Sequence, residues 1–198
     1  MPDIFVKDNT LSSHAHIFSS FCQNPIGISF KDQEEDEKII LFLRRHFITN
    51  VPWIFITLIL IIIPIAFTIL NSKLSIINLA NFPTSFVVLL TLFYYLIVFA
   101  YAFINFITWY FNISIVTQKR VIDIDFSNLV YKNVAATTLG LVQDASYTQI
   151  GVIRSVFDYG DVLVQTAGTL DNFDFTAVPH PEKVIKIIED LIGKGPNA

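Results

Sequence analysis

Two apolar stretches decide the fold of this chain. The first, Ile48–Leu70, reads ITNVPWIFITLILIIIPIAFTIL, and the second, Ser85–Phe111, reads SFVVLLTLFYYLIVFAYAFINFITWYF. Each exceeds the roughly 20 residues that a helix needs to cross a hydrocarbon core of about 30 Å. Between Arg45 and Lys119, the sequence holds one charged residue, Lys73. We predict two transmembrane helices rather than two buried core helices, because too little sequence lies outside the stretches to cover them.

The charges that flank the two stretches predict their orientation. Basic residues collect near both stretches on the side away from the connecting segment 71–84, at Lys38, Arg44, Arg45, Lys119 and Arg120. Because such residues accumulate on the cytoplasmic side, we expect a cell-membrane protein with spans 48–70 and 85–111, segment 71–84 outside and both termini in the cytoplasm. Basic and aromatic side chains also gather at membrane–water interfaces, which predicts five interface residues: Arg44, Arg45, Trp53, Trp109 and Tyr110.

The composition excludes several classes of function. Of 198 residues, 53% are hydrophobic and 15% charged, with a net charge of −4, so a nucleic-acid partner is not expected. A single cysteine, Cys22, excludes an internal disulfide. His14 and His16 lack further ligands at metal-binding spacing, and the chain has neither a glycine-rich phosphate loop nor a cofactor fingerprint. We predict no catalytic, cofactor-binding or metal-binding residue.

The sequence before the first span divides into two parts. Residues 1–31 show no clear period and predict a loosely ordered arm. Residues 32–47 read DQEEDEKIILFLRRHF, in which the early acids favour a helix start with Asp32 as N-cap and Glu35 as its capping-box partner. We therefore expect an amphipathic juxtamembrane helix over 32–47, along the inner interface or continuous with the first span.

The sequence after the second span has the alternation of half-buried strands. In the segment 121–126 the apolar residues Val121, Ile122, Ile124 and Phe126 are interrupted by Asp123 and Asp125. Further strands are predicted over 142–149, 161–167 and 173–178, separated by turn residues. An amphipathic helix follows, beginning near Pro181 and ending near Gly193, with an apolar stripe of Val184, Ile187, Ile188 and Leu191. The chain is thus predicted to be an α+β membrane protein.

Three motifs in this part of the chain resemble those of a known family. They are TQKRVI at 117–122, LGLVQDA at 139–145 and RSVFDYGDV at 154–162, followed by the Pro-led last helix. Together they resemble the bacterial pleckstrin-homology-like (PH-like) domain of YdbS-like membrane proteins, over roughly residues 32–193. The resemblance implies a strongly bent antiparallel sheet or barrel over 112–194, capped by the C-terminal helix, with a short tail at 195–198. It implies no catalytic residue.

The residues at the matching positions are expected to have structural roles: Arg120, Asp144, Tyr159, Gly160 and Asp161. Gly160 is expected to supply a positive φ in a tight turn, and the aspartates on either side of the Tyr159-Gly160 pair to accept backbone hydrogen bonds. Tyr159 is expected to pack its ring against the sheet. Arg120 either pairs with an acid such as Asp144 or extends toward lipid headgroups.

These observations favour a membrane-anchored, non-catalytic interaction module. A curved sheet offers a strand edge or groove to a protein partner or to a second copy beside the inner leaflet. From Lys119 to Ala198 the chain has seven basic and ten acidic residues, so phosphoinositide binding is not expected. The alternative is a subunit of an oligomeric transporter or channel with a cytoplasmic β vestibule. The bulky residues of both spans disfavour it, because pore helices prefer small or polar positions.

Overall fold

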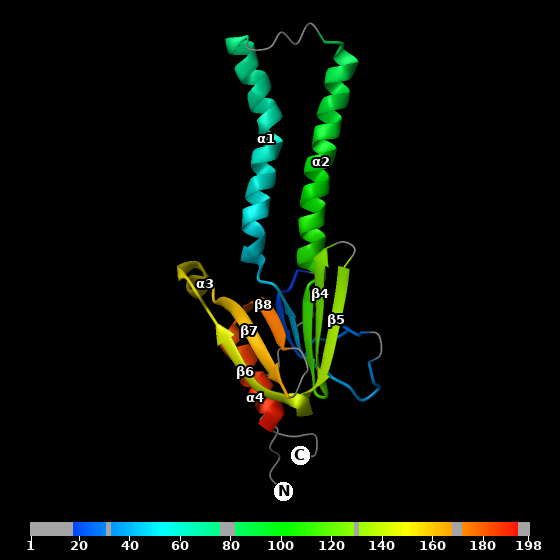
Figure 1. Ribbon diagram of the computed structural model, residues 1–198, viewed down its shortest axis with the longest axis vertical. Coiled ribbons are helices and arrows are strands. Elements are labelled where there is room, and N and C mark those ends of the chain that lie inside the picture. The colour runs from blue at the N-terminus through cyan, green and yellow to red at the C-terminus, as the bar shows by residue number, and fades with distance from the viewer. Residues whose placement is uncertain (1–17, 31–32, 76–81, 129–130, 168–171, 194–198) are drawn as a thin grey trace. The chain divides into compact units, whose positions relative to one another are not determined.

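The computed structural model describes residues 18–30, 33–75, 82–128, 131–167 and 172–193. The chain divides into two compact units (Figure 1). One, here called the hairpin, is Ile48–Trp109, and the other, here called the β domain, combines Met1–Phe47 with Tyr110–Ala198. The β domain is therefore built from sequence on both sides of the hairpin.

The hairpin consists of two long helices. A 3-10 turn at Phe47–Asn50 leads into α1, Val51–Leu74, which continues through Pro64, and α2 spans Thr84–Phe111. The Tyr94 hydroxyl of α2 donates a hydrogen bond of 2.8 Å to the Leu60 carbonyl oxygen of α1. The two predicted helices are confirmed, with α1 shifted to begin three residues later and end four residues later than predicted.

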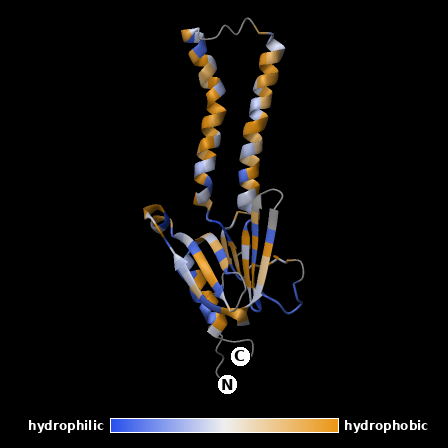
Figure 2. Cartoon of the chain, viewed as in Figure 1, coloured by the Kyte–Doolittle hydropathy of each residue, from blue (hydrophilic) through white to orange (hydrophobic). Residues whose placement is uncertain are grey.

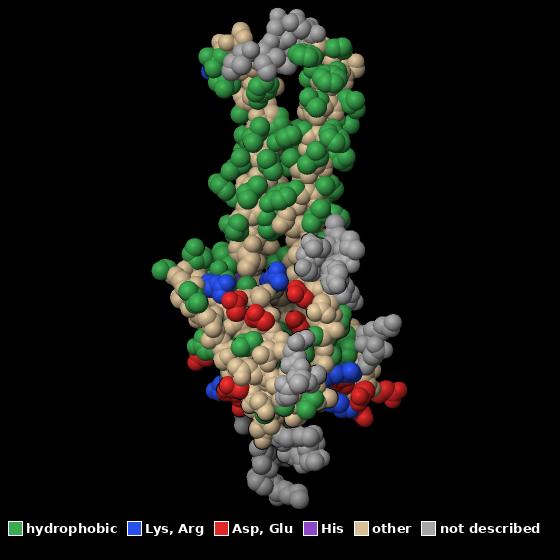
Figure 3. Space-filling model, in the orientation of Figure 1, with side chains coloured by type: hydrophobic (Ala, Val, Ile, Leu, Met, Phe, Trp, Pro, Cys, Tyr) green, Lys and Arg blue, Asp and Glu red, His purple; other side chains and the backbone are tan. Residues whose placement is uncertain are grey.

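Both helices are long and apolar enough to cross a bilayer. Hydrophobic residues follow their whole length (Figure 2). A core helix of a soluble protein would be mostly buried, yet the most apolar 18 residues of α1 are 0% buried within the structure and those of α2 are 6% buried. The side chains that would face lipid are therefore exposed, whereas acidic and basic side chains gather on the β domain (Figure 3).

The β domain contains two antiparallel sheets. The first has five strands in chain order: β1 Phe21–Gln23, β2 Ile39–Arg44, β3 Ile113–Thr117, β4 Arg120–Asn128 and β5 Tyr131–Thr138. A 3-10 turn, Leu139–Leu141, leads to the second sheet of β6 Val142–Thr148, β7 Tyr159–Thr166 and β8 Phe173–Pro179. A short helix, α3 (Val152–Val156), connects β6 to β7, and α4 (Pro181–Gly193) follows β8. The strands predicted after the second span and the terminal helix are confirmed.

The predicted juxtamembrane helix over 32–47 is wrong, because Ile39–Arg44 forms strand β2. β2 pairs with β3 on the other side of the hairpin, and both of its faces are buried: Leu41 and Leu43 belong to one core cluster, and Ile39 and Phe42 to the other. Burial on two faces outweighs a local helix-start pattern. Asp32, the predicted N-cap, lies outside the described residues.

The predicted boundaries of the arm and of the β domain are also corrected. Phe21–Gln23 in the supposed arm is strand β1, which pairs with β2. The folded domain therefore includes β1 and β2 and is not confined to residues 112–194. The rest of the arm up to residue 17, including His14 and His16, and the tail 195–198 lie outside the described residues.

The main core lies between the two sheets and α4. It contains the fully buried Val116, Val121, Val162 and Phe175, together with Val184 and Ile188 of α4. Ile187 and Leu191 of the predicted stripe pack at its margin. A smaller cluster covers the opposite face of the first sheet: Cys22, Ile39, Phe42, Ile115 and Ile122. The central strands β2, β3 and β4 thus contribute buried residues to both faces of the five-stranded sheet.

Candidate functional site

The two points where the β domain joins the hairpin lie on neighbouring strands. β2 ends at Arg44, β3 begins at Ile113, and these two residues are paired in the sheet. Asn112, the residue between α2 and β3, is buried, and its side-chain oxygen accepts a hydrogen bond of 2.5 Å from the Phe126 backbone N–H. Backbone pairing therefore holds both connections at one end of the five-stranded sheet.

A small polar cavity lies between the sheets at this end, and we call it the junction pocket. Its volume is about 30 Å³. Its polar lining residues come from β2, β3, β4, β8 and the adjoining positions: Arg44, Arg45, Asn112, Ser114, Asp123, Asp125, Asp174 and Thr176. A space of this size accommodates water, whereas pockets for small molecules are about ten times larger or more.

The junction pocket combines carboxylates with arginines. Ser114 Oγ donates a hydrogen bond of 2.6 Å to Asp123 Oδ1, and burial raises the pKa of the Asp123 carboxyl above its usual range. Burial also raises the pKa of Asp174. Arg45 Nη2 lies 3.5 Å from Asp125 Oδ1. Asp123 and Asp174 therefore stay protonated to a higher pH than exposed aspartates do. The junction pocket itself has no room for a metabolite.

Asp123→Asn is expected to stabilise the β domain at pH 7. Because the Asp123 pKa is higher in the folded than in the unfolded chain, ionisation costs stability as pH rises above the ordinary value of 3.8. Asparagine keeps an acceptor for Ser114 without the charge. Amide hydrogen exchange of β3 and β4 in detergent should slow at pH 7, with the gain shrinking toward pH 4. Asp125→Asn is the control, and slower exchange in that variant or faster exchange in Asp123→Asn contradicts the assignment.

The residues predicted to face the membrane interface have different surroundings. Arg44 is 5% exposed, and its guanidinium carbon lies 4.4 Å from the centre of the Tyr110 ring. Trp109 is 4% exposed, and Trp53 Nε1 donates a hydrogen bond of 3.0 Å to Asn50 Oδ1. Arg44 and Trp109 are thus buried within the structure, and the location of the five residues at a membrane interface stays a prediction.

Arg120 binds Glu37, a residue that sequence analysis did not single out. Arg120 Nε and Nη2 donate hydrogen bonds of 2.8 and 2.6 Å to the two carboxylate oxygens of Glu37. Thr117 Oγ1 donates a third, of 2.7 Å, and these bonds lower the pKa of Glu37 to about 2. We call these three residues the Glu37 clasp. It ties the segment before the hairpin to the β3–β4 turn after it.

Arg120 pairs with an acid, as one of the two alternatives predicted, but that acid is Glu37 and not Asp144. Asp144 is exposed on β6, and its side chain accepts a hydrogen bond of 2.9 Å from the backbone N–H of Ala145. Arg120 and Glu37 are 83 residues apart. No local spacing could indicate their contact, because it depends on the pairing of β2 with β3 across the hairpin.

Gly160 does not have the predicted positive φ. The left-handed residue of this turn is Asp158, with a φ of 49°. Gly160 is needed for a close approach of two chain segments, since a Cβ there would lie 2.7 Å from the Thr148 carbonyl oxygen and 2.8 Å from Gln149 Cγ. The turn signal was thus read correctly, but the role of the glycine was misassigned.

The other residues of the YGD motif connect β7 to its surroundings. Asp161 Oδ1 accepts a hydrogen bond of 2.8 Å from the Ala177 backbone N–H, as expected, and its second oxygen pairs with Arg154. The Asp158 carboxylate, by contrast, binds the His180 ring at 2.5 Å. The Tyr159 ring stacks on His46, with centres 5.1 Å apart and planes at 13°.

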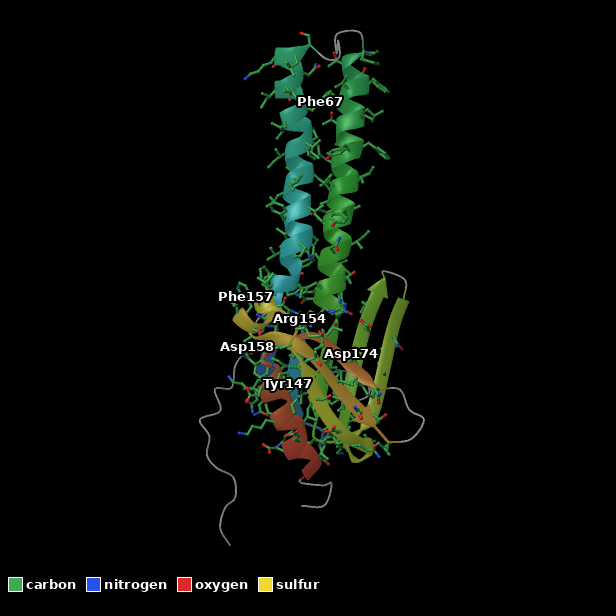
Figure 4. All side chains as sticks on the ribbon, turned by 60° about the vertical axis from the view of Figure 1, so that its left-hand side comes forward. Phe67, Tyr147, Arg154, Phe157, Asp158 and Asp174 are labelled. Carbon is green, nitrogen blue, oxygen red and sulfur yellow. The ribbon has the colours of Figure 1, made fainter. Side chains whose placement is uncertain are left out.

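The exposed apolar residues of the connection between β6 and β7 were not predicted. Between two strands a turn is usually polar, yet Ile150, Val152, Ile153, Val156 and Phe157 are all exposed there. That departure from the turn pattern was the available signal. Figure 4 shows that Arg154, Phe157 and Asp158 lie close together at one end of the β domain.

The described residues contain no group of three or more His, Cys, Asp or Glu placed to hold a metal ion. Comparison of the chain with protein-family models, with curated proteins and with solved structures found no match.

Proposed function

We propose that this chain is a membrane-anchored interaction module of the PH-like, YdbS-like type. The hairpin crosses the cell membrane twice, both termini are cytoplasmic, and the β domain binds a protein segment beside the inner leaflet. The length and exposed apolar surface of α1 and α2 support the anchor. The basic residues that flank both spans on the side away from segment 71–84 support the orientation.

The observation that carries the interaction role is the open edge of β5. Among the described strands, β5 has one neighbour, β4, so its outer edge presents unpaired backbone groups. Its one charged residue, Lys132, lies near its start; from Asn133 to Thr138 it contains neither a charged residue nor a proline, the features that usually block an edge, and Val134 is 50% exposed. Such an edge pairs readily with an extended segment from a partner or from a second copy.

The β6 edge is a weaker candidate. Like β5, it carries one charged residue, Asp144, and has one irregularity in its pairing, but α4 packs against β6 and not against β5. The β5 edge is therefore the more accessible of the two.

Val134→Lys is expected to weaken the interaction about tenfold or more, because an edge lysine opposes strand addition and its charge would be buried. A photoreactive amino acid at Ala136, which is exposed, should give one discrete adduct in native membranes. Val134→Lys should abolish that adduct. Gln143→Lys on β6 is the matched control, since it adds the same charge to the other sheet.

Two outcomes would contradict this function. An adduct that survives Val134→Lys but is lost in Gln143→Lys would move the interaction to β6. Rings of several copies that conduct ions in reconstituted vesicles would favour the channel alternative. An adduct of twice the chain mass that purified protein reproduces in detergent would identify the partner as a second copy.

A further inference from the structure

The connection between β6 and β7 carries a cluster of exposed apolar side chains, here called the α3 tip. It consists of Ile150, Val152, Ile153, Val156 and Phe157, five of the eight residues from 150 to 157. Their exposed fractions include 75% for Ile150, 80% for Val152 and 71% for Val156. Soluble surfaces carry such residues singly, and a contiguous group indicates a surface that contacts protein or lipid.

The tip is held in a defined conformation. Gly151 and Asp158, on either side of α3, have positive φ values of 100° and 49°. Arg154, the one charged residue within the tip segment, forms an ion pair with Asp161 of β7. The apolar side chains therefore extend from a segment anchored to the sheet.

The tip lies at the end of the β domain from which the chain enters the hairpin. The Arg154 guanidinium carbon lies 5.8 Å from the centre of the Tyr159 ring, and that ring stacks on His46. The His46 backbone N–H donates a hydrogen bond of 2.7 Å to the Ala177 carbonyl oxygen of β8, which holds His46 in place. The next residue, Phe47, is exposed and begins the turn that leads into α1.

We propose that the α3 tip inserts into the interfacial region of the bilayer that the hairpin spans. The inference rests on the proposed membrane anchoring and adds a lipid-binding surface to it. Lipid is the favoured occupant because the tip lies near His46, and the chain continues from His46 into the apolar helix α1. In addition, the tip's only charge is a cation already neutralised by Asp161, so lipid contact leaves no unpaired charge. The interfacial region also tolerates short apolar segments, since water there still reaches backbone groups.

The functional consequence is a fixed orientation of the β domain. The two connections to the hairpin lie on paired strands and define one line of attachment. An additional contact between the tip and the bilayer would restrict the rotation of the β domain about these connections. The edge of β5 would then be presented at a constant angle to the membrane.

The test uses the full chain in vesicles of phosphatidylcholine with a minor share of phosphatidylglycerol. Cys22, which is buried, is replaced by alanine, and a polarity-sensitive dye is attached to Ile153→Cys. Matched variants carry the dye at Glu189→Cys, on the exposed face of α4, and at Leu92→Cys, in α2. Dye at position 153 should be quenched several times more strongly by lipids with spin-labelled acyl chains than dye at position 189. Aqueous iodide should give the reverse order.

Three results would overturn the inference, and they can be told apart. If position 92 is quenched by the labelled lipids but 153 responds like 189, the hairpin spans the membrane and the tip stays in water. If 153 is shielded from both quenchers, and the shielding is lost on dilution of the protein in the vesicles, a second copy covers the tip. If position 92 is not quenched either, the membrane anchoring itself fails.

Discussion

Replacing Arg120 by alanine is expected to destabilise the β domain by about 3–5 kcal/mol, because it leaves the Glu37 carboxylate buried without its cation. The Glu37 side chain is fully buried, and Arg120 donates two of the four hydrogen bonds that its carboxylate accepts. Amide hydrogen exchange of β2 and β3 in detergent measures the loss, which corresponds to at least a hundredfold faster exchange. This clasp joins the two sequence segments of the β domain, so both strands should respond together.

The pH dependence of stability distinguishes loss of the Arg120–Glu37 ion pair from loss of packing around Arg120. The pKa of Glu37 is lowered from 4.5 to about 2 in the folded chain. Its contribution of about 3 kcal/mol is therefore complete above pH 4.5 and is lost as pH falls toward 2. In Arg120→Ala this decline should disappear. Glu35→Gln is the control, since Glu35 is exposed two residues away, and a similar loss in both variants would contradict the clasp.

Gly160→Ala is expected to destabilise the second sheet by about 1–3 kcal/mol, the usual cost of overpacking a close contact. The added methyl group would lie 2.7 Å from a backbone oxygen, so β6 and β7 must separate to accept it. Hydrogen exchange of β7 should accelerate, while the helical circular dichroism of the hairpin should not change.

Gly140→Ala provides the matched control for this prediction. A Cβ at Gly140 would meet no atom within 4 Å, and its φ is not in the left-handed region. Alanine there should be neutral or slightly stabilising, because it reduces the freedom of the unfolded chain. If Gly140→Ala and Gly160→Ala destabilise the protein equally, the close contact between residue 160 and the Thr148 carbonyl oxygen is not the cause of the loss.

If the α3 tip binds lipid and β5 binds a protein segment, the two surfaces have separate tasks. The first orients the domain and the second recruits the partner. Val134→Lys would then lower partner capture without moving a dye at position 153 out of the bilayer.

The features that the sequence predicted correctly are those encoded by neighbouring residues. Helices α1 and α2 follow from long apolar runs, the strands from alternation between Val121 and Phe126, and α4 from its apolar stripe. Each element carries its own pattern because burial of one face sets the period of the helix or strand. The turn before β7 was predicted from its own aspartate and glycine residues.

The tertiary structure alone decided the features that depend on distant segments. Residues 32–47 have a helix-start pattern, yet Ile39–Arg44 forms strand β2. It does so because β3, which follows the hairpin, pairs with it and because core clusters cover both of its faces. The Glu37 partner of Arg120, the burial of Arg44 and the space limit at Gly160 have the same origin. Each arises from contacts between residues that are separated in sequence and meet only after the strands have paired, so no local pattern records them.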